Sequence, residues 1–178
     1  MIIYSIYILN KAGGLIYQND LNPGLSKLSA NDYLVLAGTL HGVHAIATRL
    51  CPTGSNFTGE ETNVNSSIIS TGKSRLPNSN RSGLQTIETD HFSLYVFQTL
   101  TGIKFIIVTS PAPIKPTVSS GPGQSDLRKQ YDIVSDYFRQ FYTFYCDYVM
   151  KDPFYSLDMP IKSTMFDSKV KALAKDKA

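Results

Sequence analysis

The strongest constraint on the fold is the segment at residues 2–9 (IIYSIYIL), which carries apolar side chains on both of its alternating faces. A strand with one face in water alternates apolar and polar residues, so this run predicts a strand that is covered on both sides. Residues 10–14 (NKAGG) supply turn residues, and residues 15–18 (LIYQ) return. The sequence therefore predicts an N-terminal hairpin whose first strand lies centrally in a sheet.

A helix is predicted next, between residues 29 and 50. Ser29 and Asp32 have the spacing of a capping box, apolar residues follow at steps of three and four, and Pro52 stops the pattern. Sixteen uncharged residues separate Asp32 from Arg49. Because histidines and glycines interrupt this run, and a membrane span needs about 20 apolar residues, we expect a buried helix of a soluble domain.

Gly38 and Gly42 lie inside this predicted helix. Each glycine destabilises a helix by about 1 kcal/mol relative to alanine. Such a cost is usually accepted where the backbone packs very close to a neighbour, so we expect close packing at these two positions.

The rest of the chain predicts three more strands and two more helices. Strand-like runs occupy residues 84–90, 92–100 and 103–109, and Thr101 and Gly102 form a tight turn between the last two. One helix runs from Ser125 to about Met150, and a terminal helix begins with capping-box spacing at Thr164 and Asp167. The order β-β-α-β-β-β-α-α predicts an α+β fold with one mainly antiparallel sheet and helices on both faces.

Two segments interrupt this order and are rich in Ser, Asn, Gly and Pro. Residues 51–83 predict a flexible insertion, and residues 111–123 predict a flexible Pro-rich loop. Because a length of 178 residues fits one domain, we interpret residues 1–178 as a single domain with these two interruptions.

Composition and motifs argue against several functions. A net charge of +3 gives no broad basic face for nucleic acid. Cys51 and Cys146 have no partners at zinc or disulfide spacing. His41 and His44 share one helix face without a third ligand, so we interpret them as histidines packed near the sheet. We therefore expect no catalytic residues, no metal and no cofactor.

The second long helix carries more aromatic rings than one core-facing stripe can hold. Between residues 137 and 148 the rings are Tyr137, Phe138, Phe141, Tyr142, Phe144, Tyr145 and Tyr148. Tyrosines suit a protein interface because each has an apolar ring and a polar hydroxyl. We expect a subunit interface at Tyr137, Phe141, Phe144, Tyr145 and Tyr148. The alternative is that the rest of the domain covers these rings.

A second candidate surface lies at residues 150–161 (MKDPFYSLDMPI), where apolar residues stand between two prolines. Proline prevents regular hydrogen bonding, so these side chains lie on irregular backbone. Such a segment either packs across its own fold or presents anchors to a partner. The residues that combine anchors with charged neighbours are Lys151, Asp152, Phe154, Tyr155, Met159 and Pro160.

The sequence resembles the synbindin-like subunits of the TRAPP tethering complex, which are longin-domain proteins. The matching stretches are residues 10–18 (NKAGGLIYQ), 38–50 (GTLHGVHAIATRL), 88–108 (ETDHFSLYVFQTLTGIKFIIV) and 148–170 (YVMKDPFYSLDMPIKSTMFDSKV). The resemblance implies the longin (SNARE-like, profilin-like) fold, a five-stranded antiparallel sheet between one helix and two. Animal members carry a PDZ-like insertion, whereas residues 51–83 are short and Ser/Asn-rich as in fungal members, so peptide binding is not carried over.

The family implies a non-catalytic subunit of a guanine-nucleotide exchange factor for the Rab-family GTPase of ER-to-Golgi vesicle transport. Its implied partners are a second longin subunit, small helical subunits and the GTPase. We expect the six residues named above in the 150–161 segment to contact a partner subunit or the GTPase. The implied location is cytoplasmic, peripheral at Golgi and ER-derived membranes, without direct membrane insertion.

Two rival interpretations remain. One is a longin-type small subunit of a vesicle coat adaptor or a SNARE-related module, although no SNARE heptads follow the domain. The other is a small hydrolase that uses Asp90 and His91, which stand beside Glu88 in the sequence. A polar turn between strands explains those three residues more simply.

Overall fold

The computed structural model describes residues 1–50, 83–111 and 124–176. The expected insertion at 51–83 and the expected loop at 111–123 lie outside these ranges, except for Gly83 and Pro111. The strands are β1 (Ile3–Leu9), β2 (Leu15–Asp20), β3 (Thr86–Glu88), β4 (Ser93–Gln98) and β5 (Lys104–Thr109). The helices are α1 (Ala30–Arg49), α2 (Gln124–Tyr145), a π-helical turn η1 (Cys146–Met150) and α3 (Thr164–Asp176).

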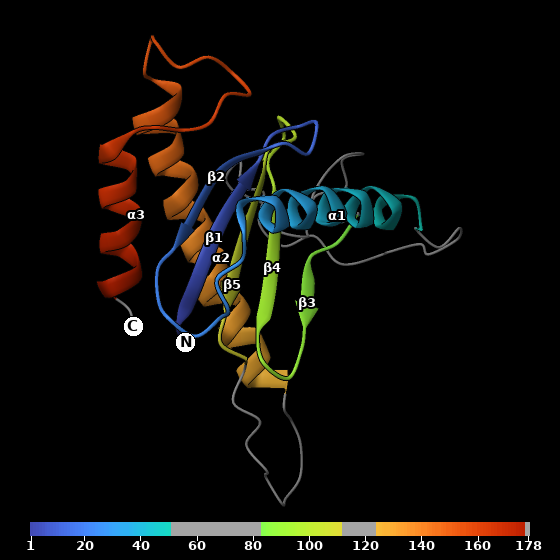
Figure 1. The fold of residues 1–178 in the computed structure, drawn as a ribbon. Helices are drawn as coiled ribbons and strands as arrows, with labels where there is room; N and C mark the ends of the chain where they lie inside the picture. The colour runs from blue at the N-terminus through green and yellow to red at the C-terminus, as the bar shows by residue number, and fades with distance from the viewer. Residues whose placement is uncertain (51–82, 112–123, 177–178) are drawn as a thin grey trace, which may run out of the picture.

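The five strands form one antiparallel sheet in the order β2-β1-β5-β4-β3. β1 pairs with β2 on one side and β5 on the other, so the first strand is interior, as its apolar sequence predicts. Figure 1 shows α2 and α3 on one side of the sheet and α1 on the other. The predicted element order, the α+β class and the longin arrangement are confirmed.

Alternation along β1 explains why both faces of the sheet are apolar. Ile6 and Ile8 belong to the core beneath α2 and α3, whereas Tyr7 and Leu9 belong to the core beneath α1. Successive side chains of a strand point to opposite faces, so one strand serves two cores.

The ends of several elements differ from the predictions. β3 is only three residues long, and the predicted helix to Met150 finishes as the π-helical turn η1. Ser163, rather than Thr164, caps α3, because the Ser163 hydroxyl accepts a hydrogen bond from the Phe166 amide at 3.2 Å. The capping box at Ser29 and Asp32 is present as predicted. None of the helices in the described part of the chain is long and apolar enough to cross a bilayer.

Candidate partner-binding surface

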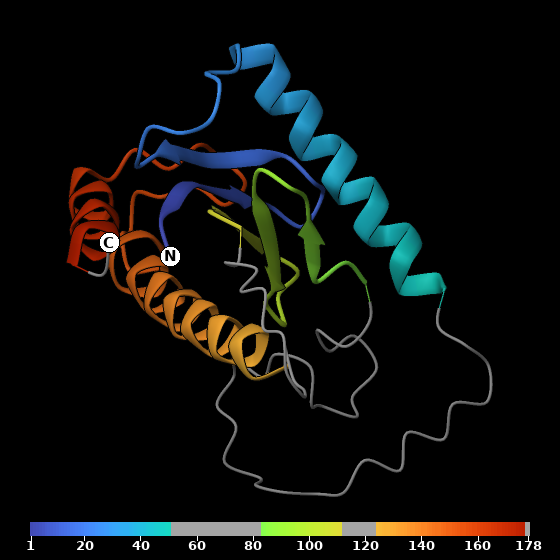
Figure 2. The same ribbon diagram turned by 90° about the horizontal axis from the view of Figure 1, so that it is seen from below.

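Helix α1 rests on the sheet through one narrow face. Its buried residues are Tyr33, Ala37, Leu40 and His44, which recur at steps of three and four. This spacing places them on one stripe of the helix. Figure 2 shows α1 as the outermost element on this side of the sheet.

The opposite stripe of α1 is also apolar, and it is exposed. We call it the outer face of α1 and define it as Val35, Gly38, Gly42 and Ile46 with the flanking Leu34 and Val43. Val35 is 67% exposed, Ile46 is 61% exposed and Leu34 is 57% exposed. A helix that is apolar on all sides is normally buried on all sides. The described residues cover only half of this helix.

The two glycines of the outer face have free space beside them. A Cβ atom added at Gly38 or at Gly42 would meet no atom of the described residues within 4 Å. The expectation of close packing at these glycines is therefore wrong within the described chain. The expectation of a buried helix holds for the stripe that faces the sheet and not for the outer face. The backbone is instead open to an approaching neighbour from outside.

Sequence reasoning missed this surface, although a signal was present. A one-sided surface helix carries charged or polar residues on its solvent side. The sixteen uncharged residues between Asp32 and Arg49 are more than one buried stripe requires. The uncharged run is therefore the sequence signal of the exposed apolar outer face.

The segment at 150–161 forms a second exposed apolar surface. Phe154 is 93% exposed, and Met150, Leu157 and Met159 are exposed as well. Lys151, Asp152 and Pro160 are also exposed, and the Lys151 Nζ lies 2.5 Å from Asp147 Oδ1. This contact raises the pKa of Lys151. Five of the six predicted residues thus lie on the surface.

This segment is irregular but held in place by hydrogen bonds. The Phe154 amide donates to Asp152 Oδ1 at 2.9 Å, and the Tyr155 hydroxyl donates to the Met159 carbonyl at 3.0 Å. The Ile161 amide donates to the Ile16 carbonyl of β2 at 2.8 Å. Tyr155 is half-buried against the core, and burial raises the pKa of its hydroxyl. The segment therefore packs through Tyr155 while it presents Phe154 outward.

The aromatic helix α2 differs from its prediction. Tyr137, Phe141 and Tyr145 are buried in the core and offer no surface to a partner. The rings of the sheet cover this face of the helix: Phe105 meets Tyr145 at a centroid distance of 5.7 Å, edge to face. α3 completes the cover through Phe166 and Val170. The prediction of a subunit interface is therefore wrong for these three residues, whose rings are covered by the same domain.

Phe144 and Tyr148 remain as candidates on this side of the molecule. Both are half-buried, and their ring centroids lie 6.3 Å apart. At this distance two aromatic rings attract each other, which adds to the free energy gained from burying their apolar surface. Their exposed edges leave part of the predicted subunit interface available.

The residues considered for other chemistry do not assemble into a site. His44 is buried, and its ring nitrogens contact the Leu84 carbonyl and Gln98 Oε1, so it is the packed histidine that was expected. Asp90 and His91 lie in an exposed turn between β3 and β4. Within the described ranges, no group of three or more His, Cys, Asp or Glu residues could hold a metal ion.

Comparison with known proteins gives consistent matches along almost the whole chain. The model of the Sybindin-like family matches residues 3–177. The trafficking protein particle complex subunit 4 of Dictyostelium discoideum is 36% identical over 97% of this chain and 96% of its own length. The protein of the same name from Mus musculus is 30% identical over 96% of this chain and 93% of its own length.

Two more distant likenesses were also found. The trafficking protein particle complex subunit 1 of Dictyostelium discoideum is 26% identical over 92% of this chain and 88% of its own length. Among solved structures, Myxococcus xanthus MglB is 14% identical with a TM-score of 0.33, over 77% of this chain and 84% of its own, a likeness too weak to support an argument. The family model and the two subunit 4 relatives together show that this chain belongs to the Sybindin-like family.

Proposed function

We propose that this chain is a non-catalytic core subunit of a TRAPP complex, which tethers vesicles and acts as a guanine-nucleotide exchange factor for the Rab-family GTPase of ER-to-Golgi transport. The names of its relatives support membership of that complex. The observation that carries the proposal is the exposed apolar outer face of α1. The protein would work in the cytoplasm, peripherally at Golgi and ER-derived membranes.

The outer face of α1 would pair with a helix of a second longin subunit. Contiguous exposed apolar surface on a soluble protein usually marks an interaction site. Gly38 and Gly42 lie four residues apart, so the partner helix can approach the backbone of α1 closely. A subunit of similar sequence would offer a helix of the same kind, and subunit 1 of Dictyostelium discoideum resembles this chain along most of its length.

The 150–161 segment would make a separate contact. Phe154 is the strongest candidate anchor because almost all of its ring is exposed on a hydrogen-bonded loop. Met159 and Pro160 extend the apolar surface, and Lys151 and Asp152 add charges at its edge. Aromatic anchors surrounded by polar groups are typical of interface hot spots. We assign this contact to the GTPase or to the small helical subunits that position it.

Nucleotide exchange by such an assembly needs no acid, base or metal from this chain. A complex that binds the nucleotide-free GTPase more tightly than the nucleotide-bound form shifts the equilibrium toward nucleotide release. The contribution of this chain would be binding surface.

The test is an Ile46→Glu variant, which places a charge on the outer face without disturbing the buried stripe. A Met165→Glu variant on α3 is the matched control, because Met165 is 56% exposed on another helix. We expect both proteins to fold, by circular dichroism, and only Ile46→Glu to lose the other TRAPP subunits on copurification. Nucleotide exchange by the purified complex should fall with that loss.

The proposal fails if the wild-type chain copurifies with adaptor large chains instead of TRAPP subunits. The outer face of α1 is not the subunit contact if the complex with Ile46→Glu keeps all its subunits and exchanges nucleotide at the normal rate.

A further inference from the structure

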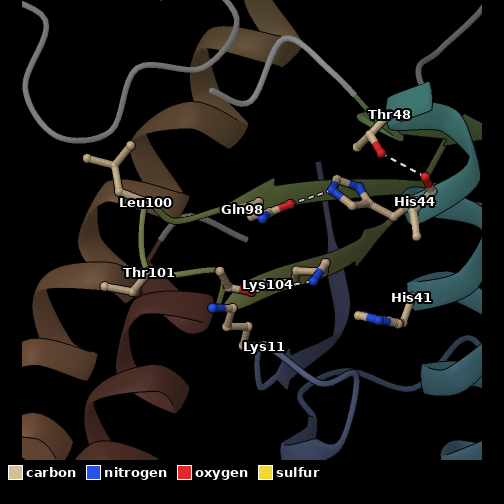
Figure 3. A pocket seen from close by; sticks show the side chains of 10 residues that line it. Lys11, His41, His44, Thr48, Gln98, Leu100, Thr101 and Lys104 are labelled. Carbon is tan, nitrogen blue, oxygen red and sulfur yellow. Dashed lines mark hydrogen bonds between the residues drawn. The ribbon is translucent and has the colours of Figure 1, made fainter. Parts of the chain in front are cut away.

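A polar cavity of about 590 Å³ lies at one end of the sheet, beneath the C-terminal half of α1. Three parts of the chain enclose it: α1, the turn between β1 and β2, and the turn between β4 and β5. The side chains that matter most are Lys11, His41, Thr101 and Lys104. Figure 3 shows Lys104 turned toward His41, with Lys11 nearby.

Lys104 is unusual because it occupies a core position. Strand alternation places it on the same face of β5 as Ile106 and Val108, which lie in the core beneath α1. The residue as a whole is only 5% exposed. Buried lysines normally have an ionic partner. Among the described residues, the Lys104 ammonium makes one long hydrogen bond, from Nζ to the Gly102 carbonyl at 3.4 Å.

Within the described ranges, the surroundings of Lys104 are positive and hold no compensating carboxylate. No Asp or Glu in the described part of the chain lines the cavity. Burial lowers the pKa of Lys104. Burial also lowers the pKa of His41, and the charges of Lys104 and His44 lower it further. An anion in the cavity would favour the charged forms of both side chains and so raise their pKa values again.

The wall of the cavity includes a buried nitrogen atom that has no hydrogen-bond partner among the described residues, and its side chains are tightly packed. His41 Nδ1 is buried and has no hydrogen-bond partner among the described residues. At Gly13, φ is +92°, and an added Cβ would lie 2.6 Å from His41 Cγ. At Gly102, φ is +90°, and an added Cβ would lie 3.0 Å from Lys11 Cγ. Only glycine lets the two turns bring these side chains so close.

We propose that this cavity binds the phosphate group of a phosphorylated small molecule or headgroup. Lys11 and Lys104 together carry two positive charges, which match the charge of a phosphate monoester near neutral pH. The ammonium groups of Lys11 and Lys104 and the Thr101 hydroxyl supply several donors for its oxygens. The volume is typical of small-ligand sites and leaves room for an organic group beyond the phosphate.

The first test uses inorganic phosphate and the isolated chain. Nuclear magnetic resonance titration at constant ionic strength should give saturable shifts of the amides of the two turns, whereas chloride should give none. Lys104→Met should lower the phosphate affinity about tenfold or more, because a charge-assisted hydrogen bond is lost. Lys11→Met serves as a second variant that cannot disturb the core, since Lys11 is exposed, and it should also weaken binding.

Lys169→Met on the exposed side of α3 is the matched control and should bind phosphate as the wild type does. Two further probes separate the sources of the phosphate: glycerol 3-phosphate, and phosphatidylcholine vesicles with or without phosphatidylinositol 4-phosphate. If glycerol 3-phosphate shifts the turn amides and Lys104→Met abolishes the shift, the ligand is a soluble phosphorylated molecule. If only the phosphoinositide vesicles give a Lys104-dependent response, the ligand is a lipid headgroup.

The proposal is overturned if phosphate shifts the turn amides no more than chloride does. It is equally overturned if both lysine variants respond as the wild type does. Because these experiments use the isolated chain, their outcome is independent of the proposed pairing through α1.

Discussion

The Tyr17 hydroxyl of β2 donates a hydrogen bond of 2.7 Å to the Asp167 carboxylate of α3, although 150 positions separate the two residues. The Asn19 side-chain amide donates to the same phenol oxygen at 2.9 Å. The Tyr17 ring also meets Phe166 edge to face at a centroid distance of 4.9 Å. These contacts fix the terminal helix against the edge strand of the sheet.

Removing this hydrogen bond should destabilise the fold without changing its shape. Tyr17→Phe keeps the ring contact with Phe166 and leaves the Asp167 carboxylate without its phenol donor. We expect a loss of about 1–3 kcal/mol in the free energy of unfolding, measured by urea denaturation. Tyr131→Phe is the matched control, because no hydrogen bond of its hydroxyl is found among the described residues. Equal stability of the two variants would show that the Tyr17 bond contributes nothing.

Stability should also fall at alkaline pH. Burial, and then the hydrogen bond to Asp167, raise the pKa of Tyr17 above that of an ordinary phenol. A group whose pKa is raised by folding contributes fully below its unfolded pKa, here about 10, and this contribution is lost as pH rises further. The alkaline loss in unfolding free energy should be smaller in Tyr17→Phe than in the wild type. Parallel pH profiles would contradict this assignment.

The two classes of ring on α2 should respond differently to truncation. Phe141→Ala removes a fully buried ring and should cost about 3–5 kcal/mol of stability. Phe144→Ala removes a half-buried ring at the surface and should cost much less in the isolated chain. Thermal denaturation of both variants distinguishes core from candidate interface. A larger loss for Phe144→Ala would reverse the assignment.

The glycines of the outer face of α1 should show opposite effects on folding and on assembly. Gly38→Ala and Gly42→Ala each replace a poor helix former where the added methyl group meets nothing. Each should stabilise the isolated chain by up to about 1 kcal/mol. The double variant should nevertheless weaken subunit copurification, because the methyl groups hold the partner helix away. Unchanged assembly would show that close approach at these glycines is not required.

Phe154 should matter for binding and not for stability. Because its ring is 93% exposed, Phe154→Ala should change the unfolding free energy by less than about 0.5 kcal/mol. Its loss should weaken association with the GTPase or a small helical subunit by about tenfold or more. Tyr155→Ala would change stability as well as binding, because Tyr155 packs against the core and its hydroxyl donates a hydrogen bond to the Met159 carbonyl. Normal affinity of Phe154→Ala in both associations would remove the ring from the proposed contact.

The sequence predicted the fold well where local patterns determine it. The doubly apolar run of β1 predicted an interior strand, and the spacing of Ser29 and Asp32 predicted the start of α1. The predicted N-cap of α3 was wrong by one residue, because Ser163 and Thr164 are both good capping residues. The Asp167 side chain, which the predicted capping box would use, instead accepts a hydrogen bond from the Tyr17 hydroxyl. Such a long-range contact leaves no local pattern.

The candidate surfaces were harder to predict. On α2 the ring count could not show which rings would be covered, since that depends on Phe105 and Phe166, far away in the sequence. On α1 the uncharged run was visible, but sequence alone could not show that the sheet covers only one stripe. The alternation along β5 predicts that Lys104 points into the core, whereas its charge predicts a place on the surface. Only the structure shows that it is buried beside a cavity.

A photo-crosslink from position 46 tests the proposed contact between the outer face of α1 and another subunit. A benzophenone amino acid would replace Ile46 in one preparation of the complex and the similarly exposed Met165 in another. We predict a single major crosslink from position 46 to a helix of a second longin subunit, and no such product from position 165. If a complex that has kept its composition gives no crosslink from position 46, the outer face of α1 does not contact another subunit.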